Sequence, residues 1–513
     1  MKLKSLLLTM TAMASMPAFA ATYYVTPDGA GTKDGSSWEN AFGVAEFRTK
    51  ASTNVNGDVY YFEGGLYNLS ESTVIFNVGT GATLIGNADG ERTVFSGDKD
   101  GNNNPDSTDA GRLVRFQANT VHGNSANKII IDNIDFTCVY TWEDDDHGNM
   151  TALMIDNSGD VVIKNCHFYN NWAQGQYGGA AAFLYRSSVR LENCIFYNNS
   201  ANYRGGALRI CSNHVDKGII TIDNCVFKNN RNYHTFGGAI FMGHGNSINI
   251  INSTIANNQA ASDGGAIYFN GYNDSFHCEL RIVNSTIAGN TTDADNDAQI
   301  VSTQGAHINI ANSIIPNDEE EAAIMFKGDT ENENFEFVSG GYNYVGNIID
   351  NVDKELVWQD TDVHGEGCSY EAIFGNNTLN SDNVIIPDVF YQGATGEEVK
   401  TAVASWGLPD DINYDVDQLG NQRTGDISMG AYAAEKESIS TSIIELPRYD
   451  NSLRLISDGS SIYTVEGYDG MVNVYSVSGA LVLKTIASNI NLMNQPNGLY
   501  IIEAGNTIFK VIR

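Results

Sequence analysis

The chain has 513 residues and a formal net charge of −33 at pH 7, because 62 acidic side chains stand against 29 basic ones. This acidity argues against nucleic acid as a partner, since binding to a phosphate backbone depends on cationic side chains. With 51 glycines and only 8 prolines, the composition favours a turn-rich β protein over a disordered chain.

Residues 1–20 have the pattern of a secretory signal peptide. Lys2 and Lys4 precede an apolar run, and a small-residue cleavage site ends at Ala20. We therefore expect cleavage after Ala20 and a secreted, outer-membrane or cell-surface protein. No later stretch is apolar over enough residues to predict a transmembrane helix.

Residues 21–57 are predicted to form a cap made of a strand, a glycine-rich loop and a short helix. This cap would cover the first strand of the following sheet, whose edge would otherwise pair with another chain. Residues 58–98 alternate apolar and polar side chains and predict the first strands of a long β domain spanning residues 58–432.

A polar loop follows these first strands. Side-chain oxygens are closely spaced around Gly101, on Asp98, Asp100, Asn102 and Asp106. A hard cation such as Ca²⁺ prefers oxygen ligands of this kind, so we take the four as candidate calcium ligands. The loop lacks the terminal glutamate of an EF-hand, and a solvated loop is the alternative.

One pattern then returns line after line from about residue 162 to residue 315, and a looser copy precedes it at residues 129–137. It contains a strand-like stretch, an asparagine and the motif NxxFxNN, and a Gly-Gly-Ala mark separates successive copies. The anchoring asparagines, 28 to 32 residues apart, are Asn133, Asn165, Asn193, Asn224, Asn252, Asn284 and Asn312. A fixed period of this length indicates stacked units, none of which can bury its apolar face alone.

The phase of the apolar residues indicates how each unit bends. Ile220 and Ile222 alternate as in a strand, but the phase shifts at Asn224. Asparagine tolerates the left-handed conformation, so one such residue can form a corner between two strands. Stacked corners would then form an amide ladder with a spacing of about 4.8 Å. With no helical period between the strands, the units predict a right-handed parallel β-helix.

The same register predicts two inward rows of side chains. One row holds Phe168, Phe196, Phe227, Ile255 and Ile287. The other holds Cys166, Cys194, Cys225, Ser253, Ser285 and Ser313. We expect the cysteines to be unpaired thiols that pack as small apolar side chains.

The Gly-Gly-Ala and NxxFxNN marks resemble the repeats of right-handed β-helix proteins of the polymorphic outer-membrane-protein type, within the pectate-lyase-like superfamily. The resemblance implies the fold and an exported location. It leaves the activity open, because this fold hosts lyases, hydrolases, adhesins and inert surface proteins.

The C-terminal part changes character. Residues 417–432 are predicted to be the last strands of the solenoid, with Arg423 pairing a carboxylate, and residues 433–450 a linker. Residues 451–513 contain short alternating segments between turns and predict a small antiparallel β-sandwich. Its segments Val472–Tyr475 and Pro496–Tyr500 resemble the C-terminal sorting domain of the type IX secretion system, which implies the secretion machinery as a partner.

Aromatic and polar side chains precede the Gly-Gly-Ala marks or point outward from the strands that follow them. Such side chains stack on and hydrogen-bond to sugars. The candidate ligand-binding residues are Trp172, Tyr177, Tyr203, Arg204, Arg209, Tyr233, His234, Phe241 and Tyr268. We expect them on one side of the stack, where they would bind an extracellular polysaccharide or a host or cell-surface glycan.

Two other functions remain open at this point. A polysaccharide lyase or glycoside hydrolase acting on acidic polysaccharide would need a base, or a pair of carboxylates, facing the bond. Arg204, Arg231, Asp144 and Asp146 are the candidates for these roles. The other alternative is a non-catalytic surface scaffold or adhesin.

Overall fold

The computed structural model describes residues 20–435 and 454–512, with short gaps. In the first part the gaps are 55–56, 78–80, 118–127, 142–150, 157, 176–178, 213–217, 272–277, 295–297, 304, 318–321, 329–334 and 351–355. In the second part they are 458–461, 467, 469, 477–480, 488, 494, 496–498 and 505–506. The predicted signal peptide up to residue 19 and most of the predicted linker lie outside the described residues. The chain divides into two compact units, residues 1–436 and 437–513.

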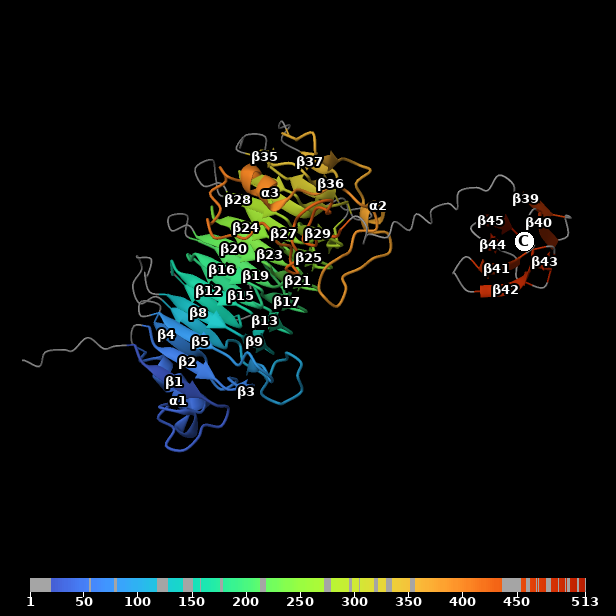
Figure 1. The fold of residues 1–513 in the computed structure, drawn as a ribbon. Coiled ribbons are helices and arrows are strands. Elements are labelled where there is room, and N and C mark those ends of the chain that lie inside the picture. Colours follow the sequence, from blue (N-terminus) through green and yellow to red (C-terminus); the bar gives the residue numbers. More distant parts are fainter. Residues whose placement is uncertain are drawn as a thin grey trace, which may run out of the picture. The chain divides into compact units, whose positions relative to one another are not determined.

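The first unit is a right-handed parallel β-helix, as predicted, whose coils stack along one axis (Figure 1). Sheet 1 contains, in spatial order, β1 (Thr22–Val25), β2 (Val59–Phe62), β5 (Ala82–Ile85), β8 (Ile129–Asp132), β12 (Val161–Lys164), β16 (Val189–Glu192), β20 (Ile219–Asp223), β24 (Ser247–Ile251), β28 (Cys278–Val283), β32 (Ala306–Ala311) and β35 (Glu336–Ser339). Sheet 2 contains β3 (Gly65–Asn68), β6 (Thr93–Ser96), β9 (Ile134–Thr137), β13 (His167–Tyr169), β17 (Ile195–Tyr197), β21 (Val226–Lys228), β25 (Thr254–Ala256), β29 (Thr286–Ala288), β33 (Ile314–Ile315), β36 (Tyr344–Val345) and β38 (Val363–His364).

Two further parallel sheets complete each coil. The short sheet contains β10 (Tyr140–Thr141), β14 (Trp172–Ala173), β18 (Ser200–Ala201), β22 (Arg231–Asn232), β26 (Gln259–Ala260) and β30 (Thr291–Thr292). Sheet 3 contains β4 (Val74–Asn77), β7 (Val114–Gln117), β11 (Leu153–Asp156), β15 (Ala182–Tyr185), β19 (Leu208–Cys211), β23 (Ile240–Gly243), β27 (Ile267–Asn270), β31 (Ala298–Thr303), β34 (Ala322–Phe326) and β37 (Ile348–Asp350). A complete coil therefore runs through sheet 1, sheet 2, the short sheet and sheet 3 before it starts again.

The asparagine corners between sheets 1 and 2 are confirmed. All seven anchoring asparagines are left-handed, with φ between 47° and 56°. The Asn224 amide donates to Asn193 Oδ1 at 2.6 Å, and the Asn312 amide donates to Asn284 Oδ1 at 2.8 Å. The ladder is interrupted at Asn252, whose amide donates instead to the backbone oxygen of Asn413.

A second asparagine ladder, which the sequence analysis missed, lies inside the coils after sheet 2. In the Asn-Asn pair of each motif, the first residue turns the chain (Asn229 has φ 54°) and the second points inward. The Asn230 amide donates to Asn258 Oδ1 at 2.9 Å and to the backbone oxygen of Phe196 at 3.0 Å. Asn171, Asn199 and Asn258 make equivalent bonds at their own levels, and the Asn290 amide donates to Gln299 Oε1 instead. These buried amides satisfy backbone carbonyls that the bend would otherwise leave without partners.

The two inward rows are also confirmed. The rings of Phe136, Phe168, Phe196 and Phe227 are fully buried and stack with centroid separations of 4.8, 4.7 and 4.4 Å and interplanar angles of at most 5°. All seven cysteines are buried, and none of them forms a disulfide. Burial of each large side chain in the row contributes about 1.5–3 kcal/mol to folding.

The N-terminal cap consists of β1, the 3-10 helix η1 (Trp38–Asn40) and helix α1 (Val44–Ala51). Phe47 of α1 is fully buried and contacts the rings of Tyr60 and Phe62 edge-on, at 5.4 and 5.0 Å. The helix therefore covers the core of the first coil.

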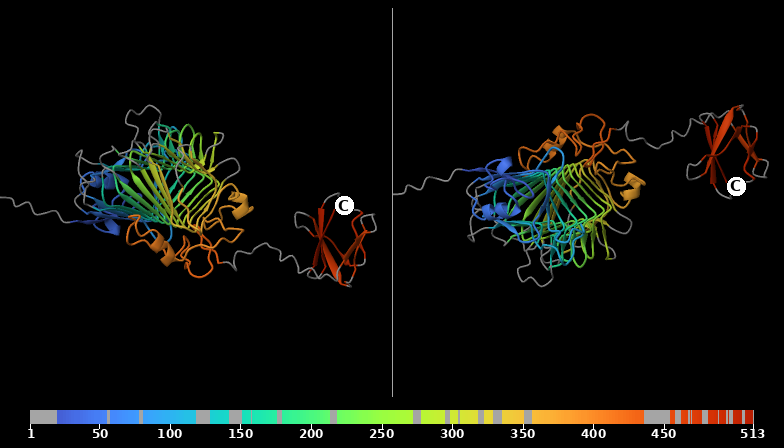
Figure 2. Two further views of the ribbon diagram at one scale, coloured as in Figure 1. Left: turned by 90° about the horizontal axis from the view of Figure 1, so that it is seen from above. Right: turned by 90° about the horizontal axis from the view of Figure 1, so that it is seen from below.

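The prediction that residues 417–432 form the last solenoid strands is wrong. Residues 365–435, which we call the strap, leave β38 and contain only helix α2 (Tyr370–Phe374), helix α3 (Gly396–Ala402) and isolated bridges. The strap lies along the outside of the later coils (Figure 2). The Gly430 backbone amide donates to the backbone oxygen of Asn312 at 2.9 Å, and the Ala431 backbone amide donates to Thr286 Oγ1 at 3.0 Å. It covers outward apolar side chains of sheet 1, among them Ile251 and Val283.

Arg423 in the strap does not pair with a carboxylate as expected. The side chain is buried, and it donates from Nη2 to the Gly430 oxygen at 2.7 Å and from Nε to the Val416 oxygen at 3.3 Å. Burial lowers the pKa of Arg423 to about 10, against an opposing effect of nearby Asp417. Backbone carbonyls of the folded strap therefore take the place of the expected ion pair.

The second unit is the predicted antiparallel β-sandwich. One sheet has the order β39 (Arg454–Ser457), β40 (Ile462–Glu466), β43 (Ile490–Asn491), and the other β42 (Leu481–Ile486), β41 (Met471–Ser476), β44 (Leu499–Ala504), β45 (Thr507–Ile512). Val472, Val474, Ile490 and Ile502 are fully buried in its core. Across both described units, no helix combines the length and apolar character needed to cross a membrane.

Candidate functional site

The outward side chains of the short sheet form one continuous row along the solenoid axis. Their backbone positions pair in register from coil to coil, in the order Tyr140, Trp172, Ser200, Arg231, Gln259 and Thr291. The alternate positions, such as Ala173 and Ala201, point inward and are buried. We call this row, together with the adjoining Tyr233 and Asp293, the short-sheet strip.

The aromatic rings of the strip stack on one another. Trp172 and Tyr233 lie 5.9 Å apart with an interplanar angle of 21°, and Tyr140 meets Trp172 edge-on at 5.9 Å. Tyr233 remains 41% exposed. Beside the strip, Tyr203 and His234 form a second stacked pair at 5.5 Å. The rings thus pair across coils instead of each presenting a free face at its own level.

The other end of the strip is polar. The Arg231 guanidinium lies 4.6 Å from the centroid of the Tyr233 ring, and Arg231 Nη2 lies 3.3 Å from Asp293 Oδ2. The second oxygen of Asp293 accepts a hydrogen bond from Gln259 Nε2 at 2.6 Å. Charge on the strip is therefore balanced by one ion pair whose members come from different coils.

Three predicted ligand-binding residues point out of the coil as expected but are not accessible. Arg209 is 3% exposed, and Phe241 and Tyr268 are each 6% exposed. They form part of the outward row of sheet 3, in which large side chains on neighbouring coils cover one another, and Phe236 stacks on Tyr268 at 4.4 Å. Burial raises the pKa of the Tyr268 hydroxyl. We therefore leave these three out of the candidate site.

Of the four candidate catalytic residues the structure describes the two arginines, which contact different partners. Arg204 is left-handed, with φ 57°, and its guanidinium lies 5.8 Å from the Phe241 ring centroid, over the sheet 3 row. Arg231 is paired with Asp293. Asp144, Asp146 and the candidate ligand-binding residue Tyr177 lie outside the described residues. Within the strip as described, Asp293 is the only carboxylate.

The acidic loop after β6 brings together a carboxylate set that differs from the predicted one. One oxygen each of Asp98, Asp100 and Asp109 lies within 4.8 Å of the other two. Asn102 turns its amide nitrogen toward Asp100 (3.0 Å) and Asp106 (2.8 Å), so it donates where a cation ligand must accept. Burial raises the pKa of Asp109, and the carboxylates of Asp106 and Asp98 add to that shift. The sequence analysis did not include Asp109 because this residue follows the closely spaced group that ends at Asp106.

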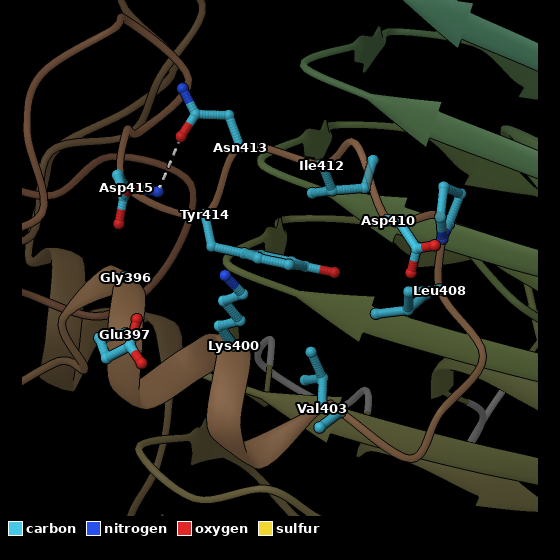
Figure 3. Close-up of a pocket in the computed structure, with 12 residues that line it drawn as sticks. Gly396, Glu397, Lys400, Val403, Leu408, Asp410, Ile412, Asn413, Tyr414 and Asp415 are labelled. Carbon is cyan, nitrogen blue, oxygen red and sulfur yellow. Dashed lines mark hydrogen bonds between the residues drawn. The ribbon is translucent and has the colours of Figure 1, made fainter.

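A cavity of about 300 Å³ lies within the strap, between α3 and residues 408–415 (Figure 3). Glu397 and Lys400 line it from the helix side, and Ile412 and Tyr414 from the loop side. Burial raises the pKa of Tyr414 to about 12, and the Asp223 carboxylate contributes to the shift. Sequence reasoning missed this cavity because it exists only once the strap has folded back on the coils.

Comparison with known proteins agrees with the fold. The family described as "Right handed beta helix region" matches residues 57–275, within the solenoid. No curated protein matches the sequence.

Among solved structures, a rhamnogalacturonan lyase aligns at 12% identity over 70% of this chain and 91% of its own, with a TM-score of 0.41. Pectate lyase Pel9A aligns at 12% identity over 81% and 96%, with a TM-score of 0.36. The Streptococcus pneumoniae surface protein and adhesin PfbA aligns at 14% identity over 66% and 96%, with a TM-score of 0.30. All three TM-scores lie below 0.5, and these likenesses leave the activity of this chain open.

Proposed function

We propose that the protein is an exported cell-surface β-helix that binds an extended glycan along the short-sheet strip. The observation that carries the proposal is the in-register outward row on the short sheet. It repeats at every coil, about 4.8 Å apart, which is comparable to the length of one sugar unit. A polymer lying parallel to the axis would therefore meet an equivalent position at each coil.

The chemistry of the strip suits a sugar chain. Tyr233 of the stacked Trp172–Tyr233 pair is 41% exposed and offers an aromatic ring, whereas Ser200, Gln259 and Thr291 offer hydrogen-bonding groups beside it. Recognition of saccharides combines these two kinds of contact. Because the rings stack on one another, each contributes modestly, and affinity would come from several contacts made together.

Two alternatives use the same surface differently. A lyase or hydrolase acting on acidic polysaccharide would require Arg231 or Arg204 to act with a carboxylate, and Arg231 is engaged by Asp293. A scaffold or adhesin would use the solenoid only as a spacer. We favour the binder because the strip joins exposed aromatic and polar groups in one row.

The sequence features near the two ends of the chain support the proposed location. The basic and apolar start with its cleavage site supports export, and the C-terminal β-sandwich supports recognition by a secretion machinery of the type IX kind. Deletion of residues 472–513 should then leave the solenoid folded but retained in the periplasm. Normal surface display of the truncated protein would contradict the sorting role.

A glycan-array screen of the purified protein, with and without calcium, tests the binding proposal. Trp172→Ala and Tyr233→Ala should each weaken binding to any glycan that scores, while the fold persists. Tyr61→Ala is the matched control, because Tyr61 is 37% exposed on sheet 1, away from the strip. Absence of binding to every glycan, or equal losses for Tyr61→Ala, would leave the scaffold alternative.

We also propose that the loop of Asp98, Asp100 and Asp109 binds Ca²⁺. Binding to the folded state alone should raise the melting temperature of the solenoid as calcium is added. Asp109→Asn should remove that rise, whereas Asp89→Asn, an exposed carboxylate on another loop, should preserve it. An equal calcium effect in both variants would contradict the site.

A further inference from the structure

Arg231, the positively charged side chain of the short-sheet strip, is paired with an acidic side chain from another coil. Arg231 Nη2 lies 3.3 Å from Asp293 Oδ2, and one face of the guanidinium lies over Tyr233 at 4.6 Å. Both charged side chains are exposed to solvent, with 39% of Arg231 and 43% of Asp293 accessible. The ion pair thus lies on the surface that a glycan would contact.

Asp293 is held in this place by the stack itself. Thr291 lies two coils beyond Arg231 in the register of the short sheet, with Gln259 at the level between them. The backbone amide of Asp293 donates to the Ala260 oxygen at 2.9 Å, and Gln259 Nε2 donates to Asp293 Oδ1 at 2.6 Å. These two bonds direct the remaining carboxylate oxygen back toward Arg231.

An arginine on a sugar-binding surface is the side chain best suited to recognise a carboxylate, because its planar donors match the two oxygens. Here a carboxylate of the chain already occupies that position. We propose that Asp293 is a specificity-determining residue that makes the strip select neutral polysaccharides over uronic-acid polymers. The inference rests on the proposed glycan-binding function and deepens it.

The physical reason is competition for one guanidinium. A uronate would have to displace Asp293 from Arg231, or else lie against a carboxylate of the same charge. The chain as a whole, at −33, adds repulsion that reaches about 10 Å at moderate ionic strength. A neutral sugar meets neither cost, since its hydroxyl groups bond equally well to a paired Arg231, to Gln259 or to Thr291.

The test compares two ligands and two variants of the full-length protein. Neutral glucan- and mannan-derived oligosaccharides and oligogalacturonates of matched length are titrated by calorimetry in a chelating buffer, so that calcium cannot bridge two carboxylates. Asp293→Asn removes the competitor, and Asp89→Asn makes the same change of charge away from the strip. Circular dichroism checks that both variants fold.

The wild-type protein should bind the neutral oligosaccharides more tightly. In Asp293→Asn the ratio of uronate to neutral affinity should rise about fivefold, the gain that an exposed arginine–carboxylate contact provides. High salt should remove that gain. Asp89→Asn should leave both affinities unchanged.

Three results would overturn the inference. If the wild type binds oligogalacturonate as tightly as neutral chains, the selectivity is wrong although glycan binding stands. If Asp293→Asn shifts the ratio no more than Asp89→Asn, then Asp293 is not the selecting residue. If no oligosaccharide of either class binds, the proposed function itself fails.

Discussion

The outward row of sheet 3 and the short-sheet strip belong to the same coils, yet one is buried and the other is at least partly exposed to solvent. Both arise from the alternation of a strand and repeat at every coil. On sheet 3, Phe241 and Tyr268 lie under neighbouring large side chains and the loop residue Phe236, whereas Tyr233 beside the short sheet remains 41% exposed. In a solenoid, pointing away from the core is therefore not the same as being available to a ligand.

The largest expected effect would sharpen this comparison. Phe241→Ala should lower the free energy of unfolding of the solenoid by about 3–4 kcal/mol, because a buried aromatic leaves a cavity. Urea unfolding followed by fluorescence measures the change. Tyr233→Ala is the matched control with an exposed ring, and a loss as large as that for Phe241 would erase the distinction between the two rows.

The next effect concerns the corners that create both rows. Asn224→Val should cost about 2–3 kcal/mol, because it removes the bond to Asn193 and places a β-branched residue at φ 55°. Asn224→Gly should cost less, since glycine keeps the conformation. If both variants lose the same free energy of unfolding in urea, the left-handed backbone conformation is not the reason that asparagine stabilises this corner.

Asp223, at the end of β20, is a third outward position and tests whether burial also controls the ionisation of an outward side chain. Burial raises the pKa of Asp223 to about 6, Glu192 adds to the rise, and Arg190, 3.5 Å away, opposes it. Arg190 also contacts Asp411 of the strap at 2.5 Å. Since the folded pKa lies above the ordinary 3.8, protonation favours the folded state. The stability that it contributes is complete below about pH 3.8 and is lost as pH rises through 6.

Asp223→Asn should therefore raise the free energy of unfolding at pH 7.5 by about 1–2 kcal/mol and leave it unchanged near pH 4. Thermal unfolding at both pH values measures the difference, with the exposed Asp89→Asn as the control. A gain of the same size at both pH values would indicate a packing effect and not a titration.

The smallest effect on stability belongs to the strip itself. Trp172→Ala combined with Tyr233→Ala should change the free energy of unfolding by no more than about 1 kcal/mol, because neither ring belongs to the buried core. Glycan binding should fall in the same variant. Loss of stability comparable to that of Phe241→Ala would make the strip a packing element instead of a binding surface.

Local spacing was enough to predict the path of the coils. The one-residue corner at Asn224, the inward stack of Phe168, Phe196 and Phe227, and the unpaired cysteines all follow from a fixed period combined with the alternation of a strand. In-register parallel stacking places equivalent positions of successive repeats in one row, so the local sequence of each repeat determines which side chains the row contains. The second ladder, through Asn230, was readable in the same Asn-Asn motif but required the inside of the bend to be known.

Tertiary structure decided what covers each row. Asp411 of the strap pairs with Arg190, which lies 221 residues away in the sequence. Gly430 of the strap bonds to Asn312, and Asp293 pairs with Arg231 from two coils away. The accessibility of Phe241, the partner of Arg423 and the carboxylate set at Asp109 depend on such contacts. The period of the sequence determines where a side chain points, but only the folded loops and strap determine whether solvent, a ligand or the chain itself lies beyond it.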